Sequence, residues 1–182
     1  MKLEQKKRDP GFKEIKWLAK GLTTDKEDKR AYINHIYKDG NRLVSTDGGR
    51  LHLLEDYTGL YESLEDGFYE VVKNTKVIVT LFLAYKKDEE DYPDIKDFVT
   101  VKDNFPQDTL QVSNSQLDIG FADIIRNMRG EKDRHGNAPN PTRSFRFDYF
   151  RDVLSSDDFF SVYHENENKP IYFKSDRLFA II

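Results

Sequence analysis

The strongest constraint on the fold of this chain is the stretch 41–55, where two short, partly apolar runs flank the turn sequence Thr-Asp-Gly-Gly. The second run alternates between polar and apolar residues over 50–53, as a strand does. Glycine has no Cβ and tolerates positive φ, so Gly48 and Gly49 favour a tight reversal between the runs. The stretch therefore predicts a β-hairpin, in which the Asp47 carboxylate is expected to accept hydrogen bonds from backbone N–H groups of the turn.

A helix is expected over 11–20, because its apolar residues recur on one side at the helical spacing of about 100° per residue. Lys13, Lys16 and Lys20 fall on nearly the opposite side, with Trp17 beside them. Such a helix can pack on a sheet and present its lysines to a phosphate backbone. The same pattern is also typical of an ordinary surface helix, which is the favoured interpretation when the helix is taken alone.

The other segments complete an α+β pattern. A second short helix is expected after Asp148, and a further helix over 117–129 is followed by a Gly- and Pro-containing loop at 130–142. The buried side of the second helix is expected to comprise Phe150, Val153 and Leu154. Strands are expected at 30–37, 68–72, 77–85, 98–101, 159–163, 170–173 and 178–182.

The composition fits one folded domain. The chain has 182 residues, and thirteen Phe and ten Tyr supply material for a core. We expect a single domain over 1–182, in which 114–142 add an extra helix and a basic loop. The chain has no Cys, in agreement with a cytoplasmic location, and no apolar run of membrane-spanning length, so no membrane partner is expected.

The net charge of −4 is unevenly distributed. Residues 1–20 hold seven Lys or Arg against three acids, and 126–146 hold six against two, so the rest of the chain is acidic. A basic region on an acidic body can hold a polyanion while the protein stays soluble. On charge alone, however, ordinary solvated faces are the favoured interpretation.

Sequence patterns for catalysis and metal binding are absent. No two of the four histidines have metal-ligand spacing, and there is no P-loop and no Gly-x-Gly-x-x-Gly. His35 and His52 lie in expected strands and are interpreted as structural, while the acidic run 88–91 lacks a calcium-loop pattern. We therefore expect a protein that is not an enzyme and that uses no cofactor or metal.

Residues 45–51, Ser-Thr-Asp-Gly-Gly-Arg-Leu, resemble the Ala-Thr-Asp-Gly-His-Arg-Leu signature of bacterial sliding clamps, the β subunit of DNA polymerase III. Ser45 stands for the Ala of that signature and Gly49 for its His. The matching positions form a structural motif of Thr46, Asp47, Gly48, Arg50 and Leu51.

Three later segments also resemble parts of a clamp domain. Residues 92–95, Tyr-Pro-Asp-Ile, are similar to the family's Phe/Tyr-Pro-Asp-Tyr element, and 147–154 are similar to the start of its second helix. Residues 169–171 and 179–182 resemble the strand pair that closes its last domain. The chain departs from the family in having room for one such domain rather than three.

The resemblance implies a DNA-clamp-like α+β domain with antiparallel sheets and two helices packed on their inner face. It also implies a non-catalytic processivity factor that binds duplex DNA without sequence specificity and has a DNA polymerase or another replication protein as a partner. The alternative is a clamp-fold protein-interaction module that no longer binds DNA. The residues expected to contact DNA are Lys13, Lys16, Lys20, Arg126, Arg129, Lys132, Arg134 and Arg151.

The resemblance further implies a homo-oligomer. The apolar strand 178–182 is expected to pair with 50–54 of a neighbouring copy, which joins copies head to tail. The alternative is that another part of the same chain covers this strand and that the protein is a monomer.

Overall fold

The structure, a computed structural model, describes all residues of 1–182 except 26, 108, 113–146, 157–158 and 165–168. The expected helix at 117–129 and the basic loop at 130–142 lie outside the described residues.

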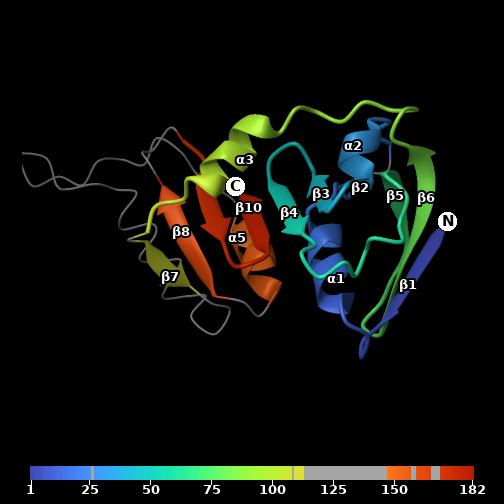
Figure 1. Ribbon diagram of the computed structural model, residues 1–182, viewed down its shortest axis with the longest axis horizontal. Coiled ribbons are helices and arrows are strands. Elements are labelled where there is room, and N and C mark those ends of the chain that lie inside the picture. Colours follow the sequence, from blue (N-terminus) through green and yellow to red (C-terminus); the bar gives the residue numbers. More distant parts are fainter. Residues whose placement is uncertain (26, 108, 113–146, 157–158, 165–168) are drawn as a thin grey trace, which may run out of the picture.

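The described strands form one ten-stranded antiparallel sheet in the order β1-β6-β5-β2-β3-β4-β10-β9-β8-β7 (Figure 1). The strands are β1 (Lys2–Lys6), β2 (Ile36–Asp39), β3 (Arg42–Thr46), β4 (Leu51–Glu55), β5 (Gly67–Asn74), β6 (Ile78–Lys86), β7 (Leu110–Val112), β8 (Phe160–His164), β9 (Ile171–Lys174) and β10 (Leu178–Ile181). The described helices are α1 (Phe12–Lys20), α2 (Ala31–Asn34), α3 (Lys96–Asp103) and α5 (Phe147–Val153), and a 3-10 turn, Leu154–Ser156, follows α5.

The sheet has two similar halves that lie side by side in Figure 1. Each half runs strand, helix and three strands, first as β1, α1 and β2–β4, with α2 between helix and strand, and then as β7, α5 and β8–β10. The hairpin of β5 and β6 extends the first half beyond β2. The halves meet where β4 pairs with β10, with Leu54 opposite Leu178 and Leu51 opposite Ile181.

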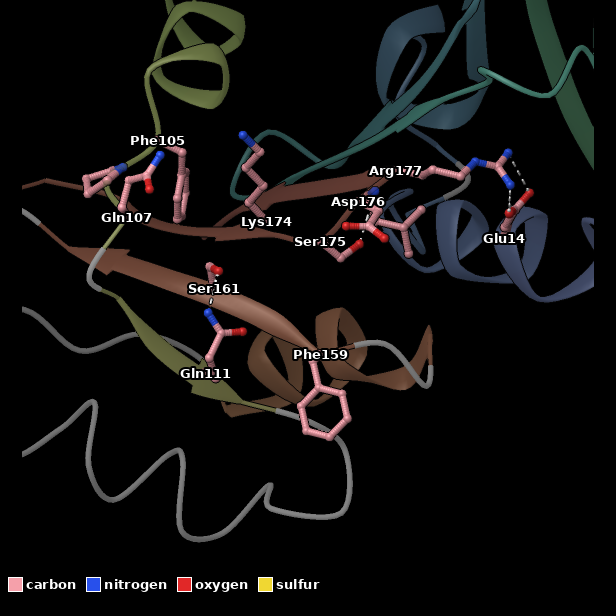
Figure 2. A pocket seen from close by; sticks show the side chains of 12 residues that line it. Glu14, Phe105, Gln107, Gln111, Phe159, Ser161, Lys174, Ser175, Asp176 and Arg177 are labelled. Carbon is pink, nitrogen blue, oxygen red and sulfur yellow. Dashed lines mark hydrogen bonds and ion pairs between the residues drawn. The ribbon is translucent and has the colours of Figure 1, made fainter.

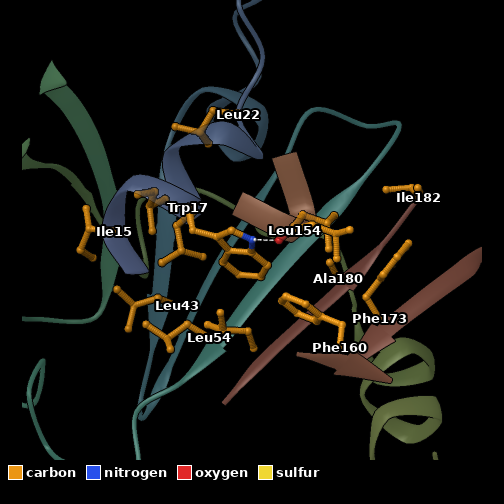
Figure 3. Close-up of a cluster of buried hydrophobic side chains, with 14 of the residues drawn as sticks. Ile15, Trp17, Leu22, Leu43, Leu54, Leu154, Phe160, Phe173, Ala180 and Ile182 are labelled. Carbon is orange, nitrogen blue, oxygen red and sulfur yellow. Dashed lines mark hydrogen bonds between the residues drawn. The ribbon is translucent and has the colours of Figure 1, made fainter. Parts of the chain in front are cut away.

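The helices α1 and α5, one from each half, cover the same face of the sheet. Ile15 and Leu18 of α1 and Phe150 and Val153 of α5 belong to one buried cluster with residues of both halves (Figure 3). The Trp17 indole N–H donates to the Val153 carbonyl across 2.8 Å, so the helices are also hydrogen-bonded to each other. This arrangement confirms the expected α+β fold with two helices packed on the inner face.

The opposite face is covered near its centre by α3. Side chains of neighbouring strand residues point to opposite faces, so Leu43 contributes to the helix-covered cluster and Val44 to the cluster beneath α3. Val99 of α3 packs on this second cluster. We expected a strand over 98–101, which is wrong. Its β-branched residues suit a strand by propensity, but packing against the sheet decides the outcome.

Two further expectations are corrected. Residues 30–37 were expected to be one strand, but 31–34 form α2 and the strand begins at Ile36. Trp17 was placed beside the lysines, yet it is only 1% exposed, because its indole packs between the two helices and the sheet. The apolar face of α1 is therefore wider than the sequence indicated.

The central hairpin has the expected form. Thr46 pairs with Leu51, and the intervening turn has Gly48 at φ 87°. The Asp47 carboxylate accepts from the N–H groups of Gly49 at 2.9 Å and Arg50 at 3.0 Å. Asp47 is thus the turn residue that the sequence predicted.

The expected pairing between copies is contradicted at both of its edges. β10 lies between β4 and β9 of its own chain, so neither it nor β4 has an edge left for a neighbour. The outermost strands among the described residues are β1 and β7. The alternative interpretation, in which the same chain covers 178–182, is the one that the structure supports.

Candidate nucleic-acid interface

The lysine side of α1 faces away from the sheet. Lys13 is exposed, and Lys16 and Lys20 are half-buried. The Lys16 ammonium donates to the Thr75 carbonyl at 2.8 Å, and burial together with the charge of Lys20 lowers the pKa of Lys16. The three lysines therefore share one surface, as the helical pattern predicted.

Two buried polar side chains of the hairpin hold the C-terminal end of α1. Ser45 donates from Oγ to the Leu18 carbonyl at 2.6 Å, and His52 Nδ1 lies 2.9 Å from the Trp17 carbonyl. Ser45 and His52 are cross-strand partners, so one rung of the hairpin binds the last turn of the helix. The last carbonyls of a helix have no partner one turn further on, and His52 supplies one for Trp17, while the Leu18 carbonyl accepts from both Ser45 and the Gly21 N–H at 2.9 Å.

His52 is neutral in this position. Its ring stacks on Trp17 with centroids 4.2 Å apart, and burial lowers the pKa of His52 to about 3. Because a carbonyl oxygen only accepts, the neutral ring must carry its proton on Nδ1. His52 is therefore structural, as we expected, and Asp47 and His52 do not form a hydrolytic pair.

The turn motif is joined to α5 through Arg50. The Arg50 guanidinium lies 2.8 Å from Asp152, 3.1 Å from Asp47 and 4.3 Å from the centre of the Tyr149 ring. The second oxygen of Asp152 lies 3.5 Å from Lys20. Asp152 thus offsets two positive charges at the junction of the two helices, one of them expected to contact DNA.

The remaining expected contact residues have different outcomes. Arg151 is exposed on α5, on the same side of the sheet as α1. Arg126, Arg129, Lys132 and Arg134 lie outside the described residues.

A further group of cations lies beside α1, which we call the basic rim and define as Lys6, Lys7, Arg8, Lys73 and Lys76. The first three belong to the basic region 1–20, but the sequence did not indicate that Lys73 and Lys76 join them. All five are exposed. The β1 end and the β5–β6 turn are brought together by a hydrogen bond from the Lys7 N–H to the Val77 carbonyl at 2.8 Å. No local signal in 73–76 indicates this neighbourhood, because it depends on the pairing of β1 with β6.

A pocket of about 790 Å³ opens at the junction of the two halves, bounded by α1, β8, β9 and the segment 105–107 (Figure 2). Several of its polar side chains have partners: Arg177 lies 2.8 Å from Glu14, and Gln111 donates to the Ser161 hydroxyl at 2.6 Å. Lys174 donates to the Lys102 carbonyl at 2.9 Å. These contacts tie part of the pocket wall into the surrounding structure.

Among the described residues, no group of three or more His, Asp or Glu side chains is placed to hold a metal ion. None of the described helices has the length and apolar character needed to cross a lipid bilayer.

The chain is similar to known proteins in its fold but not in its sequence. No protein-family model matches the chain. No curated protein matches it either. Among solved structures, the chain superposes on one from Eubacterium rectale that is assigned as a DNA polymerase III β subunit, with a TM-score of 0.51 at 13% identity. The superposition covers 100% of this chain and 64% of the Eubacterium rectale chain.

The DNA polymerase sliding clamp of Bacillus subtilis gives the same TM-score of 0.51 at 14% identity, over 100% of this chain and 63% of the clamp. The chain therefore spans less than two thirds of the length of these clamps. At such low identity the likeness concerns the fold. The chain thus has the fold of the bacterial sliding clamps, the β subunits of DNA polymerase III, as the turn motif and the order of elements indicated.

Proposed function

We propose that this protein is a non-catalytic clamp-like factor that holds duplex DNA, without sequence specificity, against the face formed by α1 and α5. The observation that carries the proposal is the lysine side of α1, which faces away from the sheet on the helix-covered face of a clamp fold. Lys13, Lys16 and Lys20 supply positive charge there, and Arg151 adds to it from α5.

Lysines on a helix suit the phosphate backbone rather than the bases. Their ammonium groups act as point charges on flexible stems, and phosphate contacts carry no sequence information. Each contact releases condensed counterions from the duplex, so affinity should fall steeply as salt is raised. The anchoring of α1 by Trp17, Ser45 and His52 keeps this charged side at a fixed place on the sheet.

The test is duplex binding by a variant with Lys13→Glu, Lys16→Glu and Lys20→Glu. We expect weaker binding for all sequences alike and a shallower dependence on salt. The matched control reverses three exposed lysines elsewhere, Lys29, Lys96 and Lys169, which changes the net charge equally. A helix variant that binds like this control, or binding that ignores salt, contradicts the proposal.

Encirclement of DNA by this domain requires several copies. We propose that copies join through β1 and β7, the outermost strands among the described residues, because strand edges pair with other chains. Light scattering on the purified protein, alone and with duplex DNA, tests this assembly. A monomer under both conditions limits the protein to lying against DNA.

A clamp-fold module that binds another protein is the second candidate function. It is favoured by a groove of about 690 Å³ on the face opposite α1, where Tyr92 stacks on Tyr37 with centroids 4.5 Å apart. The pairing of Lys20 with Asp152, which reduces the charge available to DNA, also favours it. If the wild-type protein does not bind duplex DNA at low salt, the DNA-binding function is rejected and the protein-binding module is the remaining candidate.

A further inference from the structure

We infer that the basic rim is a second contact surface for the nucleic-acid phosphate backbone, continuous with the lysine side of α1. This inference rests on the proposed function and extends it, because it adds residues of the β1 end and the β5–β6 turn to a surface otherwise formed by helices. The proposal predicts that the duplex is held at this end of the domain as well as across α1.

Hydrogen bonds connect α1 and the end of β1 to the β5–β6 turn, which carries part of the basic rim. Lys16 reaches from α1 to the Thr75 carbonyl at the tip of the β5–β6 turn, with its Nζ 2.8 Å from the oxygen. Lys6 pairs with Ile78 in the sheet, and the Lys7 N–H donates to Val77. The start of α1 and the β5–β6 turn therefore lie next to each other, at the bottom of the view in Figure 1.

The charge of this region is almost entirely positive. The three segments 6–8, 13–16 and 73–77 contain seven Lys or Arg and a single acid, Glu14. Glu14 is engaged elsewhere, since its carboxylate accepts from the Tyr61 hydroxyl at 2.9 Å and lies 2.8 Å from Arg177. The nearby Asp9 carboxylate accepts from the Lys6 N–H at 2.8 Å, which closes the turn after β1.

The opposite end of the same hairpin has the reverse character. The exposed acids of 88–91 follow β6, and Asp39 and Asp66 lie at the same end of the sheet. This loop runs along the top of Figure 1, while the basic rim lies at the bottom. A polyanion is attracted to one end of the hairpin and repelled from the other, so the charge separation gives the bound duplex a preferred end of the domain.

A nucleic acid fits this surface better than an anionic membrane does. The cations do not lie in one exposed patch at the tip, but continue from the turn onto α1 through the Lys16 contact. A long polyanion can follow such a line of charges, and each phosphate that it places there releases counterions.

The experiment compares two double variants of the same hairpin. Lys73→Gln with Lys76→Gln removes two charges of the basic rim, and Lys86→Gln with Lys87→Gln removes two at the acidic end as the matched control. Both pairs are exposed. Fluorescence anisotropy with a labelled duplex, over a series of salt concentrations, gives the slope of log affinity against log salt. Circular dichroism confirms that each variant is folded.

We expect the rim variant to lower the magnitude of this slope by about 2, because each lost phosphate contact removes about 0.9. The control variant should keep the wild-type slope. If the rim variant also keeps it while the α1 lysine variant weakens binding, the inference is overturned and the proposed function stands. If the protein does not bind duplex DNA at all, both are overturned.

Vesicles containing phosphatidylserine serve as the competing probe. The inference is overturned if the wild type binds these vesicles and the rim variant does not, while both bind duplex DNA equally. That result would assign the rim to a membrane surface.

Discussion

At the scale of single residues, His52 links the stability of the protein to pH. Its pKa is lowered from 6.5 to about 3 by burial against Trp17, so the folded state holds the ring neutral while the unfolded chain takes up a proton. The stabilisation is complete above about pH 6.5 and is lost progressively as the pH falls toward 3.

We therefore expect a His52→Gln variant to respond less to acid than the wild type. Between pH 7 and pH 5, the wild type should lose on the order of 2 kcal/mol of unfolding free energy that the variant does not lose. Urea denaturation of both proteins at the two pH values measures the difference. Equal losses in the two proteins would show that His52 is protonated, or exposed, in the folded state.

Glu55 illustrates a buried ion pair that sequence reasoning could not foresee. Its carboxylate lies 2.5 Å from the Lys102 ammonium, both side chains are less than 10% exposed, and the Tyr57 hydroxyl also donates to it. The pair joins α3 to β4 across a long stretch of chain. Such a contact depends on the position of α3 over the sheet, which no local pattern in either segment specifies.

Glu55→Gln should destabilise the protein by about 3 kcal/mol, because the buried Lys102 charge then keeps only the exposed Asp103, 3.3 Å away, as a counterion. Chemical denaturation measures the loss, and hydrogen exchange should show faster opening of α3 in particular. Glu89→Gln, an exposed carboxylate beyond β6, is the control and should change little. A similar loss in both variants would contradict the assigned role of Glu55.

At the scale of elements, α1 and α5 carry charges that partly cancel. Asp152 of α5 lies 3.5 Å from Lys20 of α1 and 2.8 Å from the largely buried Arg50 side chain of the hairpin, so it partly neutralises Lys20, one of the lysines of the proposed DNA surface. The short helix α5 was expected from its apolar residues, and Phe150, Val153 and Leu154 are all fully buried. Its charge pairing with α1 was not expected, because it depends on how the two helices meet.

Asp152→Asn should strengthen duplex binding severalfold, since it removes a negative charge from the proposed surface and releases Lys20 from its counterion. It should also lower stability, because Arg50 loses one of its two carboxylate partners. Anisotropy measures the affinity and thermal unfolding measures the stability. The control, Asp91→Asn, removes the same charge from an exposed position beyond β6. If the two variants bind duplex DNA with equal affinity, the expectation is contradicted.

The elements that the sequence predicted well are those whose pattern is local. The central hairpin, α1 and α5 each have their spacing or turn chemistry within about ten residues. The elements that it predicted wrongly, α2 and α3, are short and contain β-branched or aromatic residues whose preference the surrounding packing overrides. Trp17 belongs to the same class, because its burial requires α5, far along the chain.

At the scale of the whole molecule, β10 is a central strand and not a joining edge between copies. Ala180 is fully buried and pairs with His52 on one side and Phe173 on the other. Ala180→Pro should therefore abolish folding, because it removes a backbone donor from the middle of the sheet. Lys2→Pro, at the first residue of the outer strand β1, should be tolerated.

Circular dichroism and thermal unfolding of the two proline variants test this expectation. An Ala180→Pro protein that melts like the wild type, with only its oligomeric state changed, would restore the pairing between copies that the sequence suggested. The resemblance identified the fold correctly but assigned this strand to the wrong partner, since the pairing of β4 with β10 within one chain is visible only in three dimensions.

The pairing of β4 with β10 also has a consequence for how the chain reaches its native state. The first half can form six neighbouring strands while β4 still lacks its partner, and all five residues of β4 are buried in the finished sheet. Pairing β4 with β10 closes a long loop of chain, and this has an entropic cost that local hairpins avoid. The pairing of β4 with β10 should therefore be slow. Until it is complete, an apolar edge is open to other unfinished chains, and chaperone binding during synthesis would act at this strand.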